Sequence, residues 1–187
     1  MTDTQTLPTP AGPKLIEDFV NTIELDVEGP EREALSDPAA LRAWLAERDL
    51  LPDGADVGDD DVERAHRVRE ALRHLLLANN GEPLDPSAIT TLNAAADESH
   101  LRVEFSPDGQ ADLVPDASGV PGALSRMLAV SYTAMHDDTW HRLKACRFDT
   151  CQWAFYDNSK NRSRSWCSMQ VCGNRAKARA YRERQRG

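Results

Sequence analysis

The sequence contains no cysteine before position 146, and aromatic residues make up only 6% of the chain. No apolar run approaches the roughly 20 residues that span a bilayer, and the N-terminus lacks the positively charged head of a signal peptide. These absences predict a cytoplasmic protein with no membrane segment. In a reducing compartment, thiols are more easily metal ligands than partners in disulfides.

Motifs of the common catalytic classes are missing as well. There is no G-x-G-x-x-G, P-loop, G-x-S-x-G or H-E-x-x-H, and no internal repeat. Acidic residues are plentiful, but no short spacing isolates a pair that could act as a catalytic dyad. The aspartate run at 59–61 lacks the spacing of a calcium loop and is better suited to capping the helix that follows. We therefore expect a protein that is not an enzyme.

The four cysteines are spaced C-x4-C-x15-C-x4-C, at Cys146, Cys151, Cys167 and Cys172. Two close pairs separated by a loop-sized spacer suit tetrahedral Zn²⁺, because each pair can wrap one edge of the ion. Two disulfides or four unrelated buried thiols are the alternatives. Four cysteines would close the coordination sphere and leave no position for a reactive water. His136 or His141, which lie just upstream, could also replace one thiol.

Basic residues are concentrated at the end of the chain. The net charge is −9, which by itself argues against nucleic acid. Residues 141–187, however, carry twelve Lys and Arg against three Asp and Glu, so they have a net charge of +9, whereas residues 1–140 have −18. This asymmetry indicates a module that binds a polyanion, attached to an acidic body.

A basic helix is expected after the last cysteine. Its arginines recur at i, i+4, i+7 and i+11 and fall in one stripe, where like charges cost helix stability that an anionic partner would restore. The candidate nucleic-acid-binding residues are Arg175, Arg179, Arg182 and Arg186 in the stripe, Lys177 on the opposite side, and Lys160, Arg162 and Arg164 in the spacer. Aromatic residues are interleaved in the spacer: Trp153, Phe155, Tyr156 and Trp166. A solvated tail, or a helix docked on the acidic body, is the alternative.

The fold class we expect is α+β and mostly helical, with one β-hairpin in the body and a small zinc module at the C-terminus. Residues 1–12 are predicted to be a disordered tail, 13–142 the helical body, and 143–187 the zinc module. The expected elements of the body are helices from Pro13, from Asp37-Pro38, from Asp60 to about Asn79, from Asp85-Pro86 and from about Pro121 to around Arg142, with a hairpin over 101–106 and 111–114. No flexible linker separates the body from the module, so we expect the two to be packed together.

Asn21, near the end of the first expected helix, allows two interpretations. A polar residue with poor helix propensity there fits a fraying terminus. The functional alternative is that its side chain turns into a ligand pocket.

The chain also resembles a known family. Cys172-Gly173-Asn174-Arg175 reads CGNR, and the flanking segments 155–161 (FYDNSKN) and 166–184 (WCSMQVCGNRAKARAYRER) are similar to the CGNR zinc fingers. Segments 18–22 (DFVNT), 37–45 (DPAALRAWL) and 92–97 (LNAAAD) resemble the domain called ABATE that precedes this finger. The resemblance covers about residues 15 to 185. It implies a treble-clef-like zinc module with four cysteine ligands and a bacterial, DNA-binding, stress-linked regulator.

Together, these observations predict a zinc-dependent transcription regulator that binds duplex DNA. The acidic body would sense a small-molecule or protein effector, an expectation that rests on the resemblance. A zinc-stabilised module for RNA or protein, and a thiol redox switch that ejects zinc, are the alternatives. Because the acidic body repels polyanions, isolated residues 141–187 should bind DNA more tightly than the whole chain. The sequence does not specify the oligomeric state, the DNA site or the ligand.

Overall fold

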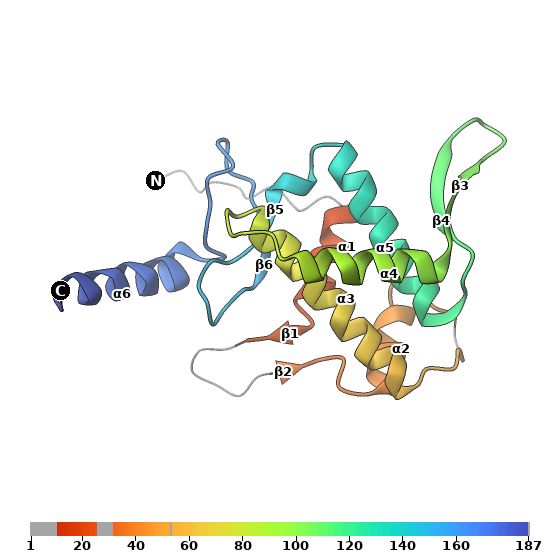
Figure 1. Ribbon diagram of the computed structural model, residues 1–187, viewed down its shortest axis with the longest axis horizontal. Helices are drawn as coiled ribbons and strands as arrows, with labels where there is room; N and C mark the ends of the chain where they lie inside the picture. The colour runs from red at the N-terminus through yellow and green to blue at the C-terminus, as the bar shows by residue number, and fades with distance from the viewer. Residues whose placement is uncertain (1–10, 26–31, 53, 187) are drawn as a thin grey trace.

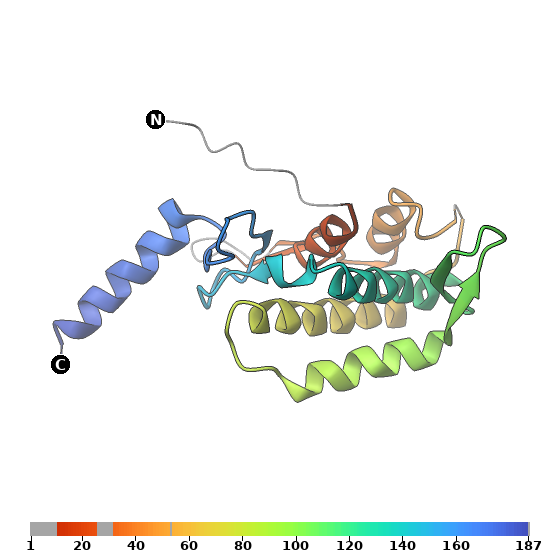
Figure 2. The same cartoon turned by 90° about the horizontal axis from the view of Figure 1, so that it is seen from above.

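The computed structural model describes residues 11–25, 32–52 and 54–186. Five helices form the body, and Figure 2 shows them in three layers, with α4 on one side, α3 and α5 in the middle, and α1 and α2 on the other side. Their bounds are α1 Ala11–Val20, α2 Pro38–Ala46, α3 Asp59–Ala78, α4 Pro86–Ser99 and α5 Gly119–His136. The central position of α3 gives it contacts with α1, α2, α4 and α5.

Burial of the apolar faces explains this arrangement. Ile16 and Phe19 of α1, Leu72 of α3 and Leu124 of α5 are at most 1% exposed and belong to one continuous core. Two helices begin at the capping signals expected from the sequence. The Asp37 carboxylate accepts a hydrogen bond from the Ala40 amide at 2.9 Å, and Asp85 accepts one from Ser87 at 2.8 Å. Each cap pairs a backbone donor that the first helical turn leaves without a partner.

Two helix bounds differ from the sequence-based expectation. The first helix begins at Ala11, so the predicted disordered tail does not include residues 11 and 12, and residues 1–10 lie outside the described part of the chain. Pro13 fits because the first turn of a helix needs no amide donor there. The helix expected to reach Arg142 ends at His136, because Asp138 adopts a left-handed backbone (φ 64°). A short 3₁₀ turn, η1 (Trp140–Arg142), follows.

The predicted hairpin is confirmed as β3 (Leu101–Phe105) and β4 (Ala111–Pro115), and it projects from one end of the body in Figure 1. Two further antiparallel pairs occur among the described residues. One joins β1 (Ile23–Glu24) to β2 (Arg32–Glu33), and the other joins β5 (Leu143–Ala145) to β6 (Ala154–Tyr156). Strands of two or three residues are too short to show an alternating pattern, so no sequence signal marks them.

The C-terminal module follows the 3₁₀ turn. It consists of β5, a knuckle at residues 146–151, β6, a loop at residues 157–166, a π-helical turn η2 (Met169–Gly173) and the helix α6 (Asn174–Arg184). The strand β5 contacts α3 and β6 contacts α1, so the module packs against the body as expected. The helix α6 extends away from the body in Figures 1 and 2, and none of its residues is buried. In the described ranges, no helix is long and apolar enough to cross a membrane.

Candidate metal centre and basic helix

The structure brings the four cysteines to one point. Cys146 and Cys151 lie on the knuckle between β5 and β6, Cys167 follows the 157–166 loop, and Cys172 lies in the π-helical turn. Their sulfur atoms all lie within 4.8 Å of one another. In the described part of the chain, no histidine or carboxylate joins this group, so the structure gives no support to a substitution by His136 or His141.

The geometry fits a tetrahedral thiolate site. Metal–sulfur bonds of about 2.3 Å place the sulfur atoms of a tetrahedral site about 3.8 Å apart. The Sγ atoms of Cys151 and Cys167, and those of Cys167 and Cys172, are 3.6 Å apart. This distance is far longer than the roughly 2.05 Å of a disulfide bond, and all four cysteines are free thiols. These cysteines are therefore arranged so that they could hold a metal ion, and they do not form two disulfides.

The thiols are linked to one another by hydrogen bonds. Those from Cys151 and Cys167 lower the pKa of Cys146, and the hydrogen bond to Cys146 raises the pKa of Cys151. A divalent metal bound here would replace the thiol protons, because thiols that coordinate a metal are deprotonated.

The residues after Cys172 shape the start of α6. A Cβ atom on Gly173 would lie 2.5 Å from the Met169 sulfur and 3.2 Å from the Trp166 ring, so a larger residue here would displace the exposed Met169 side chain. The Asn174 amide donates a hydrogen bond to the Gln170 carbonyl at 3.0 Å, one turn back. Both residues thus support the π-helical turn that holds Cys172, and π-helical turns are frequent at functional sites.

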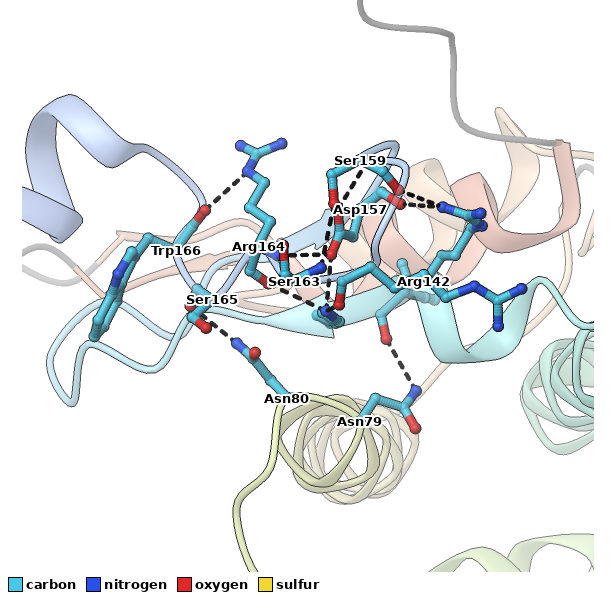
Figure 3. A network of polar contacts seen from close by, with 12 residues as sticks. Asn79, Asn80, Arg142, Asp157, Ser159, Ser163, Arg164, Ser165 and Trp166 are labelled. Carbon is cyan, nitrogen blue, oxygen red and sulfur yellow. Dashed lines mark hydrogen bonds and ion pairs between the residues drawn. The ribbon is translucent and has the colours of Figure 1, made fainter.

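A buried ion pair organises the 157–166 loop. Figure 3 labels Asp157, Ser159 and Arg164 of this loop. Lys144 on β5 donates a hydrogen bond to the Asp157 carboxylate at 2.8 Å, and also to the carbonyls of Arg162 and Arg164. The Asp157 side chain is 0% exposed and accepts the backbone amides of Ser159 and Arg164 as well. Although burial raises the pKa of Asp157, these hydrogen bonds keep it below its ordinary value. The pair thus fixes the loop between the two cysteine pairs.

Side chains from α3 hold the module through its backbone carbonyls. Asn79 donates to the carbonyls of Trp140 and Leu143, and Asn80 donates to those of Ala145 and Ser165, at 2.7–2.9 Å (Figure 3). These contacts join the last turn of α3 to β5 and to the loop before Cys167. The body therefore sets the position of the metal site.

Asn21 takes part in the same interface and not in a pocket. Its side-chain oxygen accepts the Ala154 amide at 2.7 Å, and its nitrogen donates to the Ala154 carbonyl at 2.9 Å. The hydrogen bonds expected for a ligand are thus made to β6. The pocket interpretation of Asn21 is corrected by this geometry to a docking role.

Two buried arginines on α3 were missed from the sequence. The Arg73 side chain is 1% exposed and donates to the carbonyls of Val20 and Gln152 at 2.7 and 2.9 Å. Arg69 pairs with Glu33 at 2.7 Å, and both arginines pair with Glu70 at 2.9 Å. A signal was available, because Arg69 and Arg73 continue the inward-facing series that begins at Ala65.

The structure separates the candidate nucleic-acid residues into two groups. Arg162 pairs with Asp138 at 2.5 Å, and Arg164 donates to the Trp166 and Cys167 carbonyls while its guanidinium lies 4.7 Å from the centre of the Phe155 ring. Arg164 therefore supports the fold of the module, whereas Arg162 is exposed and its pair with Asp138 contributes little free energy. Phe155 and Tyr156 are also buried, which leaves Trp153, at 36% exposure, and the half-buried Trp166 as aromatic residues near the surface.

The second group lies on or near α6. Lys177, Arg179, Arg182 and Arg186 are exposed, and Arg175 is half-buried beside Cys172. Arg179 pairs with Asp149 at 2.7 Å, and Arg182 donates to the Ala178 carbonyl at 3.3 Å. Within the described ranges, Lys160, Lys177 and Arg186 have no side-chain partner. The basic helix is therefore not docked on the acidic body.

Two family models match the chain. The first, ABATE, is described as "Putative stress-induced transcription regulator" and matches residues 14–136. The second is described as "CGNR zinc finger" and matches residues 142–185. No curated protein matches the chain.

Proposed function

The chain belongs to the ABATE family, whose description reads "Putative stress-induced transcription regulator", and it ends in a CGNR zinc finger. From this premise we propose that it is a zinc-dependent regulator that binds duplex DNA through α6. The ion we assign to the four cysteines is Zn²⁺, because four thiolates at tetrahedral spacing are its preferred structural site. Such a site has no open position for a substrate or a water, and for this reason we propose that the protein is not an enzyme.

The observation that carries the proposal is the position of α6. The helix buries no residue, extends away from the acidic body and carries Arg175, Lys177, Arg179, Arg182 and Arg184. Its 11 residues extend about 16 Å, and an α-helix fits the width of the major groove. An anionic duplex would lower the repulsion among these side chains.

Zinc would act in this function by orienting the helix. Cys172 lies in the turn that leads directly into α6, so a metal bound there fixes the start of the helix relative to the knuckle. The body then fixes the knuckle through Asn79 and Asn80. These contacts would orient α6 and its basic side chains relative to the body.

A salt series tests the proposal. If four arginines reach phosphates, the logarithm of the binding constant should fall against the logarithm of the salt concentration with a slope of about −3.6. Replacing Arg179 and Arg182 with Ala should weaken binding and reduce the slope to about −1.8, with the zinc content unchanged. Fluorescence anisotropy with a labelled mixed-sequence duplex measures both quantities.

The matched control replaces Arg67 and Arg102 with Ala, which removes the same charge from exposed positions on α3 and β3. This control should leave the slope near the wild-type value. Equal binding by the α6 variant and the wild type across the salt series would contradict DNA binding. It would favour a zinc-stabilised module for RNA or protein. Binding of single-stranded RNA would then distinguish an RNA-binding module from a protein-binding one.

The sensing part of the proposal concerns the body. A small-molecule effector would have room in a hollow of about 580 Å³ between the start of α1, β4 and α5, with apolar walls from Pro13, Val114 and Val130 and the charged Arg126 at its edge. Asn21 does not line this hollow. Thermal stabilisation by candidate ligands, abolished by Val130→Trp, would test it.

A further inference from the structure

Arg179, in the middle of the basic stripe, is held between two carboxylates. Its Nη1 atom lies 2.7 Å from Asp149 on the knuckle, and its Nε atom lies 3.2 Å from Glu183 one turn later in α6. Glu183 is a neighbour on the same helix, but Asp149 belongs to a different segment, 30 residues earlier in the chain. The Asp149 contact therefore ties the projecting helix back to the metal knuckle.

The contact is a single hydrogen bond from the Arg179 Nη1 atom to one Asp149 oxygen, and an arginine can donate such a bond equally to a phosphate oxygen. Phosphates and carboxylates both present paired oxygens to a guanidinium, and Arg binds either group by the same donors. The side chains of Arg179 and Asp149 are 57% and 66% exposed, so the contact is open to solvent and to a competing anion. An exposed pair of this kind contributes little free energy, so a competitor can displace it.

A shallow hollow lies beneath the pair. It measures about 270 Å³ and is lined by Phe148 and Trp166 on one side and by Ala176 and Ala180 of α6 on the other. Small alanines on the inner side of the helix leave this space unfilled, so α6 is held near the knuckle by the Arg179–Asp149 pair over the hollow and by the turn at Cys172. The Asp149 contact is thus well placed to restrain the helix without burying it.

We propose that Asp149 is an intramolecular substitute for a DNA phosphate: it occupies Arg179 in the free protein and is displaced when the duplex binds. This inference rests on the proposed function and adds to it a residue that limits affinity. In the free protein, Asp149 cancels one charge of the stripe. Binding of the duplex exchanges the carboxylate for a phosphate, and no covalent change occurs.

The first test is made without DNA. In the full-length, zinc-loaded protein, the Arg179 Nε–H signal in a nitrogen-15 NMR spectrum, assigned by its loss in Arg179→Lys, should shift when Asp149 is replaced with Asn. The control Asp116→Asn breaks a similar exposed contact, that of Arg102 with Asp116, far along the chain from α6. It should leave the Arg179 signal in place. An Arg179 signal that does not respond to Asp149→Asn would overturn the inference while leaving DNA binding untouched.

The second test uses a mixed-sequence DNA duplex of about two helical turns. Asp149→Asn should bind it about two- to fivefold more tightly than wild type at low salt, because no carboxylate has to be displaced. Asp116→Asn, which removes the same charge elsewhere, should change affinity much less. In an Arg179→Ala background, the gain from Asp149→Asn should fall to the level of Asp116→Asn.

The outcomes separate the two proposals. If Asp149→Asn weakens binding or leaves it unchanged with zinc content intact, Asp149 positions the helix or does nothing there, and the inference is wrong. If wild type and Asp149→Asn both fail to bind while the Arg179 signal still responds to Asp149→Asn, the contact exists but the proposed DNA function fails. If Asp149→Asn both shifts the Arg179 signal and tightens DNA binding, the exchange of Asp149 for a phosphate is supported.

Discussion

Lys144 and Asp157 bring opposite charges into the interior of the C-terminal module, at 6% and 0% side-chain exposure. Taking charges out of water is costly, and the cost is offset here because every donor or acceptor in the pair also has a backbone partner. The role of Asp157 is therefore structural. It fixes the loop that carries Lys160 and that leads to Cys167.

Replacing Lys144 with Met should leave the Asp157 carboxylate buried without its cation. We expect the free energy of unfolding to fall by about 3–5 kcal/mol, as for other broken buried pairs. The control Arg32→Met breaks the exposed pair of Arg32 with Glu24, and it should cost less than about 1 kcal/mol. Urea unfolding of both variants measures the difference, and a Lys144→Met protein as stable as the control would contradict the prediction.

At the residue scale, the sequence predicted which residues could bind a metal better than it predicted the contacts of individual side chains. The spacing of the cysteines was enough to predict that Cys146 and Cys172 share one site, because two close pairs can surround a metal ion in few ways. The partners of Asn21 could not be predicted, because they lie 133 residues away in the chain. The burial of Arg73 could be predicted only from its helical position in line with Ala65 and Arg69, because arginine is exposed in most proteins.

At the scale of elements, the last turn of α3 is where the body meets the module. Asn79 and Asn80 each donate to two carbonyls, so four backbone acceptors of the module depend on two side chains. Both residues follow the last helical residue, Ala78, and they point at the module because the helix ends there. A helix terminus thus doubles as the docking site of another element.

Asn80→Asp should disrupt this junction. The change keeps the shape of the side chain but replaces its amide donor with a carboxylate oxygen. The hydrogen bonds to the Ala145 and Ser165 carbonyls are then lost, and the negative oxygen faces their partly negative oxygens. We expect the free energy of unfolding to fall by about 1–3 kcal/mol, together with faster loss of zinc to a chelator. The control Asn93→Asp makes the same change on the exposed face of α4 and should alter neither quantity.

The helices were more predictable than the strands. Long amphipathic segments such as α3 repeat their signal over many turns, and caps such as Asp37 mark the starts. The strands of β1–β2 and β5–β6 are two or three residues long and carry no local pattern, and β5 and β6 are placed by their contacts with α3 and α1. The π-helical turn at Cys172 is likewise set by the cysteine and by the close packing of Gly173.

At the scale of the whole molecule, the described residues form one large core, which extends from the body helices to Leu143, Ala145, Ala154 and Tyr156 of the module, and one small cluster around the cysteines. The small cluster contains Cys146, Phe155 and Cys172, with Phe148 and Trp166 packed against it. So few apolar groups contribute little stability around the cysteines, so a bound metal would stabilise this part of the module, whereas β5 and β6 are held by the large core.

Removing the metal should unfold the region around the cysteines and leave the helical body folded. Chelation under reducing conditions should abolish DNA binding and reduce the far-ultraviolet helical signal only by the share of α6, since the body core from Ile16 to Leu124 does not depend on the cysteines. Adding Zn²⁺ back should restore both. Circular dichroism and anisotropy on one sample measure this, and unfolding of the whole chain on chelation would show that the body depends on the metal.

The two amide contacts of Asn21 have a consequence for any attempt to divide the chain. They cover the open edge of β6, which pairs with β5 on its other side, much as a neighbouring strand would. An uncovered edge of this kind is a template for pairing with another chain. Residues 141–187 expressed alone would carry the edge bare. We expect this fragment to self-associate, which would mask the tighter DNA binding that its charge predicts.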